Sequence, residues 1–169
     1  MPRSTPWLIA AALTLLPLSQ ARALCVYHGD LSAETTLAQE FGDSDWVVRG
    51  RVVSAEDNWS DGRMGDDEAP WTLYRVQILE RFKGEPTAGI SVFTYRDSGG
   101  FYMDRGGDGA DIGGEYLLFL NLTEPGTDLP VGARDAMIAN YSCGQSRSWL
   151  EVPQADRLRL AALAGREVR

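Results

Sequence analysis

The sequence predicts a mainly β protein: a small, closed, five-stranded barrel with a short N-terminal helix and a C-terminal helix. Short strand-like runs recur along the chain and are separated by turn-rich segments. Two long loops, rich in glycine and acidic residues, interrupt these runs. Two cysteines, Cys25 and Cys143, bracket nearly all of the runs. These three observations indicate a single small barrel whose two ends lie close together.

The N-terminus reads as a cleavable export signal covering residues 1–23. Arg3 supplies the positive start, and residues 7–18 (WLIAAALTLLPL) form an uncharged apolar run. A cut after Ala23 has small residues at the −3 and −1 positions, which signal peptidase requires. The run is too short for a hydrocarbon core of about 30 Å. We therefore expect no membrane anchor, a mature chain starting at Leu24, and a secreted or periplasmic protein.

The predicted mature chain, residues 24–169, is long enough for one domain with its own core. Its formal charge falls from −8 to −10, because Arg3 and Arg22 leave with the signal. Such a field repels phosphate backbones and anionic lipid headgroups. Nucleic acid is therefore not expected as a partner, and basic proteins or divalent cations are better candidates.

An even cysteine count agrees with export and predicts a disulfide between Cys25 and Cys143. Closing so long a loop would stabilise the fold by about 4–5 kcal/mol, because it restricts the unfolded chain. One alternative is a pair of unbridged thiols in a reducing compartment. Another is a metal site that adds His28, but three scattered donors do not make a zinc signature. We expect no metal site and no cofactor.

The expected elements follow the barrel order. They are a helix over 31–42, strands over 45–54, 71–82 and 90–96, strands over 115–121 and 136–141, and a helix over 153–164.

The first helix is predicted from its ends and its apolar spacing. Ser32 is a candidate N-cap, Glu34 would lie in the positive first turn, and Gly42 is a candidate end. Leu37 and Phe41 are four residues apart and so share one face.

The strands are predicted from alternation and from apolar runs. Trp46, Val48, Gly50 and Val52 alternate onto one face of the strand over 45–54, and Gly50 suits a sharp bend in a small barrel. The run 115–121 (EYLLFLN) is continuously apolar, as expected for a strand buried on both faces.

The sequence also predicts which residues face the core in one further strand and in the last helix. In the strand over 71–82 one side carries Tyr74, Val76, Ile78 and Phe82. In the last helix Pro153 suits the first turn and Gly165 the end. The residues predicted to face inward there are Leu158, Ala161, Ala162 and Leu163.

Two long loops, 56–70 and 97–114, separate the strands. Five strands with two long loops are typical of the oligonucleotide/oligosaccharide-binding (OB) type of barrel. Trp46, Trp71, Tyr116 and Phe119 fall on strands and are expected in the core.

Short sequence motifs extend this pattern along nearly the whole mature chain. They are Cys25, Phe41, residues 45–52 (DWVVRGRV), 74–76 (YRV), 82–84 (FKG), 92–94 (VFT), 114–119 (GEYLLF) and Cys143 with Gly144. In order and spacing they resemble the netrin-like fold of tissue inhibitors of metalloproteinases. The resemblance implies an OB-type barrel and a non-enzymatic binding module that contacts or inhibits an exported metalloprotease. The partner-contacting residues would be Leu24, Cys25, Val26 and Tyr27, with the 56–70 loop beside them.

The start of the mature chain departs from that family. Family inhibitors begin with Cys-x-Cys, and the free amine of the first cysteine binds the zinc of the protease. Here the order is Leu24-Cys25-Val26-Tyr27, so the second cysteine is absent. Leu24 also converts the Cys25 nitrogen into an amide, which has no lone pair for zinc. We therefore expect partner contact without zinc chelation.

A second hypothesis is a calcium- or carbohydrate-binding envelope protein that uses the loop 104–111. Residues 106–111 (GGDGAD) match the start of a calcium-binding nonapeptide, although Gly113 occupies its apolar position. Asp104, Asp108 and Asp111 supply carboxylates, and the aromatic residues Trp59, Phe101 and Tyr102 lie in the two long loops.

Enzymatic activity is not expected. His28 is the only histidine, so any nucleophilic triad would have to use it. The chain has no Gly-x-Ser-x-Gly sequence, and acidic residues in glycine-rich loops are usually solvated.

Overall fold

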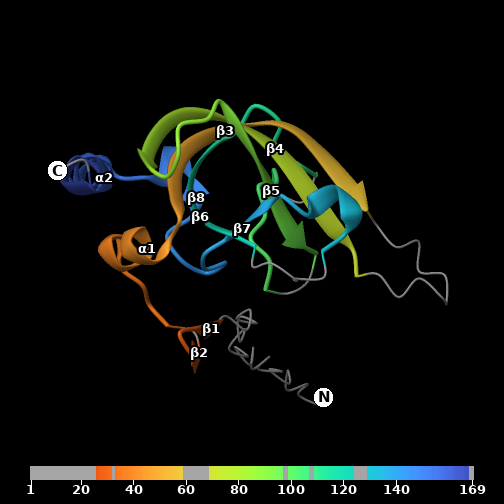
Figure 1. Cartoon of the computed structure of the whole chain (residues 1–169), viewed down its shortest axis with the longest axis horizontal. Helices are drawn as coiled ribbons and strands as arrows, with labels where there is room; N and C mark the ends of the chain where they lie inside the picture. Colours follow the sequence, from red (N-terminus) through yellow and green to blue (C-terminus); the bar gives the residue numbers. More distant parts are fainter. Residues whose placement is uncertain are drawn as a thin grey trace, which may run out of the picture.

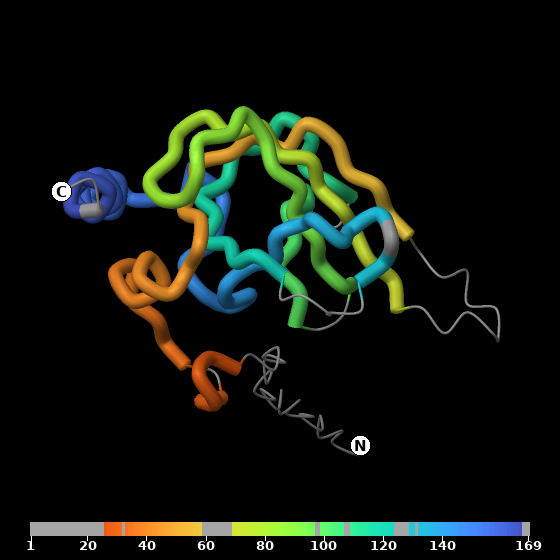
Figure 2. Tube along the Cα trace, viewed as in Figure 1, coloured from red at the N-terminus to blue at the C-terminus, as the bar shows by residue number. Residues whose placement is uncertain are grey.

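A computed structural model of the chain describes residues 26–31, 33–58, 69–96, 99–106, 109–123 and 129–167 (Figures 1 and 2). The predicted signal, its cleavage site, Leu24 and Cys25 lie outside these residues, so export and the Cys25–Cys143 bridge stay predictions. The elements in chain order are β1 Val26–Tyr27, β2 Asp30–Leu31, α1 Leu37–Asp43, β3 Trp46–Asn58, β4 Trp71–Lys83, β5 Gly89–Tyr95, β6 Glu115–Leu122, η1 Val131–Ala133, β7 Met137–Ala139, β8 Arg147–Ser148, η2 Trp149–Glu151 and α2 Gln154–Glu167.

Five strands close into a barrel. β3 pairs antiparallel with both β4 and β6, and β4 pairs antiparallel with β5. β7 pairs parallel with β5 and antiparallel with β6, which completes the ring (Figure 1). β8 adds a short pairing to the start of β6. The predicted mainly β class and closed five-stranded barrel are confirmed, and a C-terminal helix follows the barrel as expected.

The barrel interior holds one apolar cluster that includes the predicted inward residues Trp46, Val48 and Val52. Gly50 lies between them at a register shift of the β3–β4 pair, so the predicted bend is present. A Cβ atom added to Gly50 would lie 2.3 Å from Cγ1 of Val76 on β4. A side chain at this position would overlap Val76 unless Val76 moved, because β3 and β4 are paired neighbours here.

A second cluster lies outside the barrel wall, beneath the helices. It joins Leu37 and Phe41 of α1, Leu160 of α2, and Leu117 and Phe119 of β6. β6 therefore has apolar contacts on both faces, as its continuous run predicts.

Phe82 also belongs to this outer cluster, so its assignment to the side of Tyr74 and Val76 is wrong. Gly50 pairs with Ile78 and Arg49 with Glu80, which leaves Leu79 as an extra residue ahead of Phe82. A bulge turns the side chains that follow it to the other face.

The helix before the barrel begins later than predicted. Thr36 is the N-cap of α1, and it forms a reciprocal capping box with Gln39. The expected start at residue 31 with a Ser32 cap is wrong, because Leu31 pairs in β2 and α1 starts at Leu37. Leu37 and Phe41 are both buried, as their spacing predicts.

α2 is longer than predicted and turns a different face inward. It continues through Gly165 to Glu167. Leu160 is fully buried, whereas Leu158, predicted to face inward, is 63% exposed. Ala161 and Ala162 are exposed as well. Leu160 and the partly buried Leu163 and Ala164 make the apolar contacts with the rest of the protein.

Several other boundaries differ. β3 continues to Asn58, so the loop predicted from Glu56 begins three residues later. β7 covers Met137–Ala139 only, and the short elements β8, η1 and η2 were not predicted. No helix in the described part of the chain combines the length and the apolar character that a bilayer crossing requires.

Candidate functional site

The segment predicted to contact a partner folds into a small hairpin. Val26 pairs with Leu31, and Tyr27 pairs with Asp30. His28 and Gly29 make the turn with positive φ angles of 49° and 90°, as a tight two-residue hairpin requires.

The hairpin presents two apolar side chains to solvent. Val26 is 53% exposed and Leu31 is 66% exposed, although the two residues lie directly opposite each other. Together these two branched aliphatic side chains form a small exposed apolar surface. Below, "hairpin surface" means Val26 and Leu31.

Tyr27 and His28 attach the hairpin to α1. The Tyr27 hydroxyl donates a 2.5 Å hydrogen bond to Oδ2 of Asp43, and the His28 ring nitrogen Nε2 lies 3.2 Å from the same oxygen. The Tyr27 ring also lies 4.9 Å from the ring of Tyr141, measured between centroids. The hairpin is therefore held from two directions.

These contacts shift two pKa values. Burial, and then the hydrogen bond to Asp43, raises the pKa of Tyr27 to about 12. The hydrogen bond from Tyr27, and then the one from His28, lowers the pKa of Asp43. Asp43 is accordingly ionised, and Tyr27 is a neutral donor, at every physiological pH.

A second layer of contacts holds the connection between the hairpin and α1. The Tyr141 hydroxyl donates to the carbonyl of Ala33 at 3.2 Å, and Nε2 of Gln145 donates to the carbonyl of Thr35 at 2.6 Å. Cys143 lies exposed between these two anchors. The turn that carries Cys143 therefore lies along the chain that leads from the hairpin into α1.

Glu40 is the buried centre of this layer. Its side chain is fully buried, and Oε1 accepts hydrogen bonds from the Thr35 hydroxyl and from the Gln145 N–H, the latter at 2.8 Å. Oε2 is buried without a hydrogen-bond partner among the described residues. Burial raises the pKa of Glu40, although the two hydrogen bonds and the charge of Arg147 oppose this.

The structure brings together only part of the predicted site. Val26 is exposed and Tyr27 is half-buried against α1. Leu24 and Cys25 lie outside the described residues, as do residues 59–68 of the loop expected beside them. The roles of Asp43, Glu40 and Tyr141 were missed, since these residues meet the hairpin only through the fold.

Two carboxylates of the glycine-rich loop that the structure describes, Asp104 and Asp111, are paired with arginines. Arg96, whose side chain is only 8% exposed, pairs with Asp104 and with Asp57, at 3.4 Å from the latter. The Tyr74 hydroxyl donates to Asp104 at 2.7 Å. Arg105 pairs with Asp111 at 2.8 Å.

These ion pairs occupy carboxylate oxygens that a cation would need as ligands. Burial opposes ionisation of Asp104, but the hydrogen bonds from Arg96 and Tyr74 outweigh it and lower the pKa of Asp104. No group of three His, Cys, Asp or Glu side chains placed to hold a metal is found in the described segments. Asp108 lies outside them. A calcium ion in this loop would have to displace the arginines, and the calcium hypothesis stays a prediction.

Comparison with known proteins adds no assignment: no protein-family model matches this chain, and no curated protein matches it.

Proposed function

We propose that this protein is an exported, non-enzymatic binding module with an OB-type barrel, and that its protein partner contacts the hairpin surface. The observation that carries the proposal is the pairing of two exposed apolar residues, Val26 and Leu31, on a hairpin fixed to the body of the protein. A contact surface that is already held in place binds at a lower entropic cost than a mobile segment.

The barrel connectivity supports the OB-type assignment. Taken in chain order, the five barrel strands pair first with second, second with third, third with fifth, fifth with fourth, and fourth with first. The pairing of the third and fifth strands, β5 and β7, is the parallel one. A small five-stranded barrel with this crossover is a Greek-key arrangement, as OB-type barrels are.

The resemblance to tissue inhibitors of metalloproteinases makes an exported metalloprotease the most specific candidate partner. Those inhibitors present their first mature residues to the protease, and the hairpin surface begins two residues after the predicted mature start at Leu24. The amide at Cys25 argues for contact through apolar side chains beside the catalytic zinc, without coordination of the metal.

The test is an inhibition assay with the exported protein, after N-terminal sequencing has fixed its first residue. Peptide hydrolysis by a set of secreted zinc metalloproteases is measured with increasing amounts of protein. We expect at least one protease to be slowed, and Val26→Ser with Leu31→Ser to remove the effect. The matched control is Leu150→Ser, because Leu150 is 92% exposed elsewhere, on η2. Unchanged rates with every protease would reject the metalloprotease partner.

A further inference from the structure

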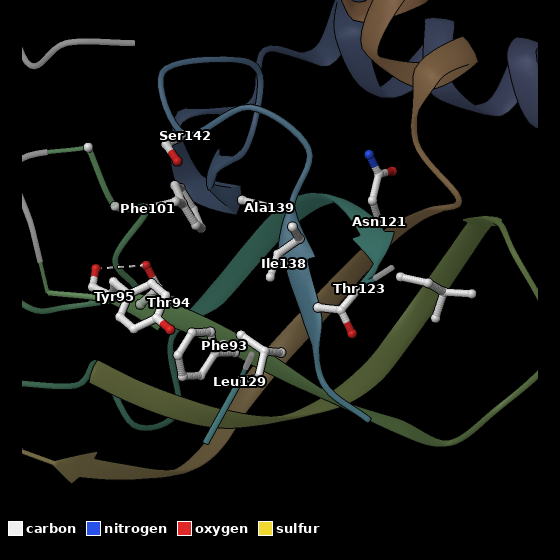
Figure 3. A pocket seen from close by; sticks show the side chains of 13 residues that line it. Phe93, Thr94, Tyr95, Phe101, Asn121, Thr123, Leu129, Ile138, Ala139 and Ser142 are labelled. Carbon is white, nitrogen blue, oxygen red and sulfur yellow. Dashed lines mark hydrogen bonds between the residues drawn. The ribbon is translucent and has the colours of Figure 1, made fainter. Parts of the chain in front are cut away.

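The strongest unassigned feature is a pocket of about 590 Å³ where the barrel wall opens. β5 and β7 share a single pair, Val92 with Met137, among the described residues. Both strands then continue, β5 to Tyr95 and β7 to Ala139. Residues from both continuations line the pocket, so it occupies the fork between two parallel strands (Figure 3). None of its lining residues belongs to the hairpin.

The pocket is apolar and partly aromatic. Phe93 and Leu129 are buried and form its floor, and the rings of Tyr95 and Phe101 lie on one side of it (Figure 3). Leu122 and Ile138 line the opening, and they are 58% and 38% exposed. Exposed aliphatic side chains at the mouth of an apolar hollow indicate a binding site.

None of the thirteen described residues that line the pocket is Asp, Glu, Lys, Arg or His. The whole chain carries 40 such charged residues other than histidine, so an uncharged lining of this size contrasts with the rest of the sequence. A charged ligand would lose its hydration here without gaining a counter-charge, which is costly. The described part of the lining therefore favours a neutral ligand.

Three polar side chains of the lining, those of Thr94, Thr123 and Asn121, already have partners within the protein. The Thr94 hydroxyl donates to the carbonyl of Tyr95, and the Thr123 hydroxyl donates to the carbonyl of Ala136. Asn121 accepts from the N–H of Asp45 and donates to Asn140. A sugar needs several available hydrogen-bonding groups around its hydroxyls, whereas an aliphatic or aromatic side chain needs none.

We propose that this pocket receives an uncharged apolar side chain from an extended peptide segment of a protein partner. The volume lies within the range of about 300–1,000 Å³ that is usual for ligand pockets, so it accepts one large side chain with part of the neighbouring backbone. An extended peptide suits the fork, because it carries N–H and C=O groups along both edges and can lie beside a strand that has left its neighbour.

The test is an NMR titration of the full exported protein, labelled with nitrogen-15. The probes are acetylated and amidated pentapeptides, Ser-Thr-X-Thr-Ser, in which X is Leu, Ile, Met, Phe or Asp. With at least one apolar X, we expect changes in the amide chemical shifts of residues around the pocket. When X is Asp, we expect binding to be at least fivefold weaker. Shifts of equal size with Asp, or no shifts with any apolar peptide, would overturn the proposal. So would binding of maltotriose or chitotriose at the pocket in place of the peptides.

Variants make the assignment specific. Ile138→Glu places a charge at the opening and is expected to weaken binding of the apolar peptides at least fivefold, while Ile138→Val preserves it. Leu150→Glu is the control outside the pocket, and melting temperatures show that each variant is folded. Val26→Ser with Leu31→Ser should leave peptide binding unchanged, so failure at the pocket and failure at the hairpin surface are separable. Equal binding by Ile138→Glu and the unmodified protein would contradict the proposal.

Discussion

The backbone of Gly144 lies directly against the carboxyl group of Glu40. A Cβ atom added to Gly144 would lie 2.0 Å from Oε1 and 2.7 Å from Oε2 of Glu40. Glu40 belongs to α1, and Gly144 follows Cys143, so this contact fastens the turn after β7 to the helix before β3. The hairpin surface depends on both segments through Asp43 and Tyr141.

Gly144→Ala should therefore destabilise the protein. The methyl group must displace a fully buried side chain, and such overpacking typically costs about 1–3 kcal/mol. Gly165→Ala is the matched control, because nothing lies within 4 Å of its added Cβ and it sits in the exposed part of α2. That change should stabilise the helix by about 0.5–1 kcal/mol. Urea unfolding measures the free energy of unfolding of both variants. Equal free energies for Gly144→Ala and Gly165→Ala would contradict the contact.

The burial of Glu40 predicts a pH dependence. Its pKa in the folded state lies above the ordinary value of 4.5, so its contribution is fully present in acid and is lost as pH rises through the folded pKa. Glu40→Gln keeps the acceptor for Gln145 and removes the charge. We expect the variant to gain stability relative to the unmodified protein over the pH range above about 4.5, with a slope of at most about 1.4 kcal/mol per pH unit.

Chemical unfolding at several pH values measures this difference. The comparison isolates Glu40 from its charged neighbours Asp43 and Arg147, which are common to both proteins. A stability difference that stays constant across this range would show that Glu40 is not held in a low-dielectric site.

Asp104 should show the opposite dependence. Its pKa is lowered below the ordinary value of 3.8, so the stability it contributes is present above that pH and is lost as pH falls through the folded pKa. Asp104→Asn leaves Arg96 with a poorer partner in a buried position and should cost about 1–3 kcal/mol at pH 7. The cost should shrink below about pH 4.

Asp111→Asn is the control for Asp104→Asn. Its partner Arg105 is 71% exposed, and such surface pairs contribute about 0–1 kcal/mol. Thermal unfolding at pH 7 and at pH 3.5 compares the two variants. Equal losses at pH 7 would mean that the Arg96 pair is no more important than an exposed one.

Gly50→Ala tests the close approach of β3 and β4. The added Cβ would lie 2.3 Å from Cγ1 of Val76, so the free energy of unfolding of the variant should fall by about 1–3 kcal/mol. Val76→Ala removes the clashing methyl group and should partly rescue Gly50→Ala, although alone it is destabilising because it leaves a cavity. A double-mutant cycle from urea unfolding measures the coupling. Strictly additive losses would contradict the contact.

The barrel was predictable because its signal is local. Alternation placed Trp46, Val48 and Val52 inside, and a continuous apolar run identified β6. The signal for the start of α1 was also local, since Thr36 and Gln39 have the spacing of a capping box. Ser32 is also of a residue type that caps helices, but the N-cap of α1 is Thr36.

The errors have long-range causes. The side taken by Phe82 depends on a bulge opposite Arg49 and Gly50, which no pattern within β4 reveals. In α2, which face turns inward depends on contacts with β4 and α1, and these favour Leu160 over Leu158.

The candidate site shows the same limit. The candidate partner-contacting stretch at Val26 and Tyr27 came from the resemblance, and the exposure of Val26 could not be read from the sequence. Asp43, which fixes it, is sixteen residues from Tyr27. The pocket between β5 and β7 unites segments that only barrel closure brings together, so no sequence motif marks it.

The central claim is that a protein partner contacts the hairpin surface, and photo-crosslinking tests it most directly. A photo-reactive side chain replaces Val26 in one variant and the equally exposed control Leu158 in another, and the exported proteins are irradiated in their native host. The account predicts a covalent adduct to one exported protein from position 26 and none from position 158. Adducts of the same kind and yield from both positions, or none from position 26, would contradict it.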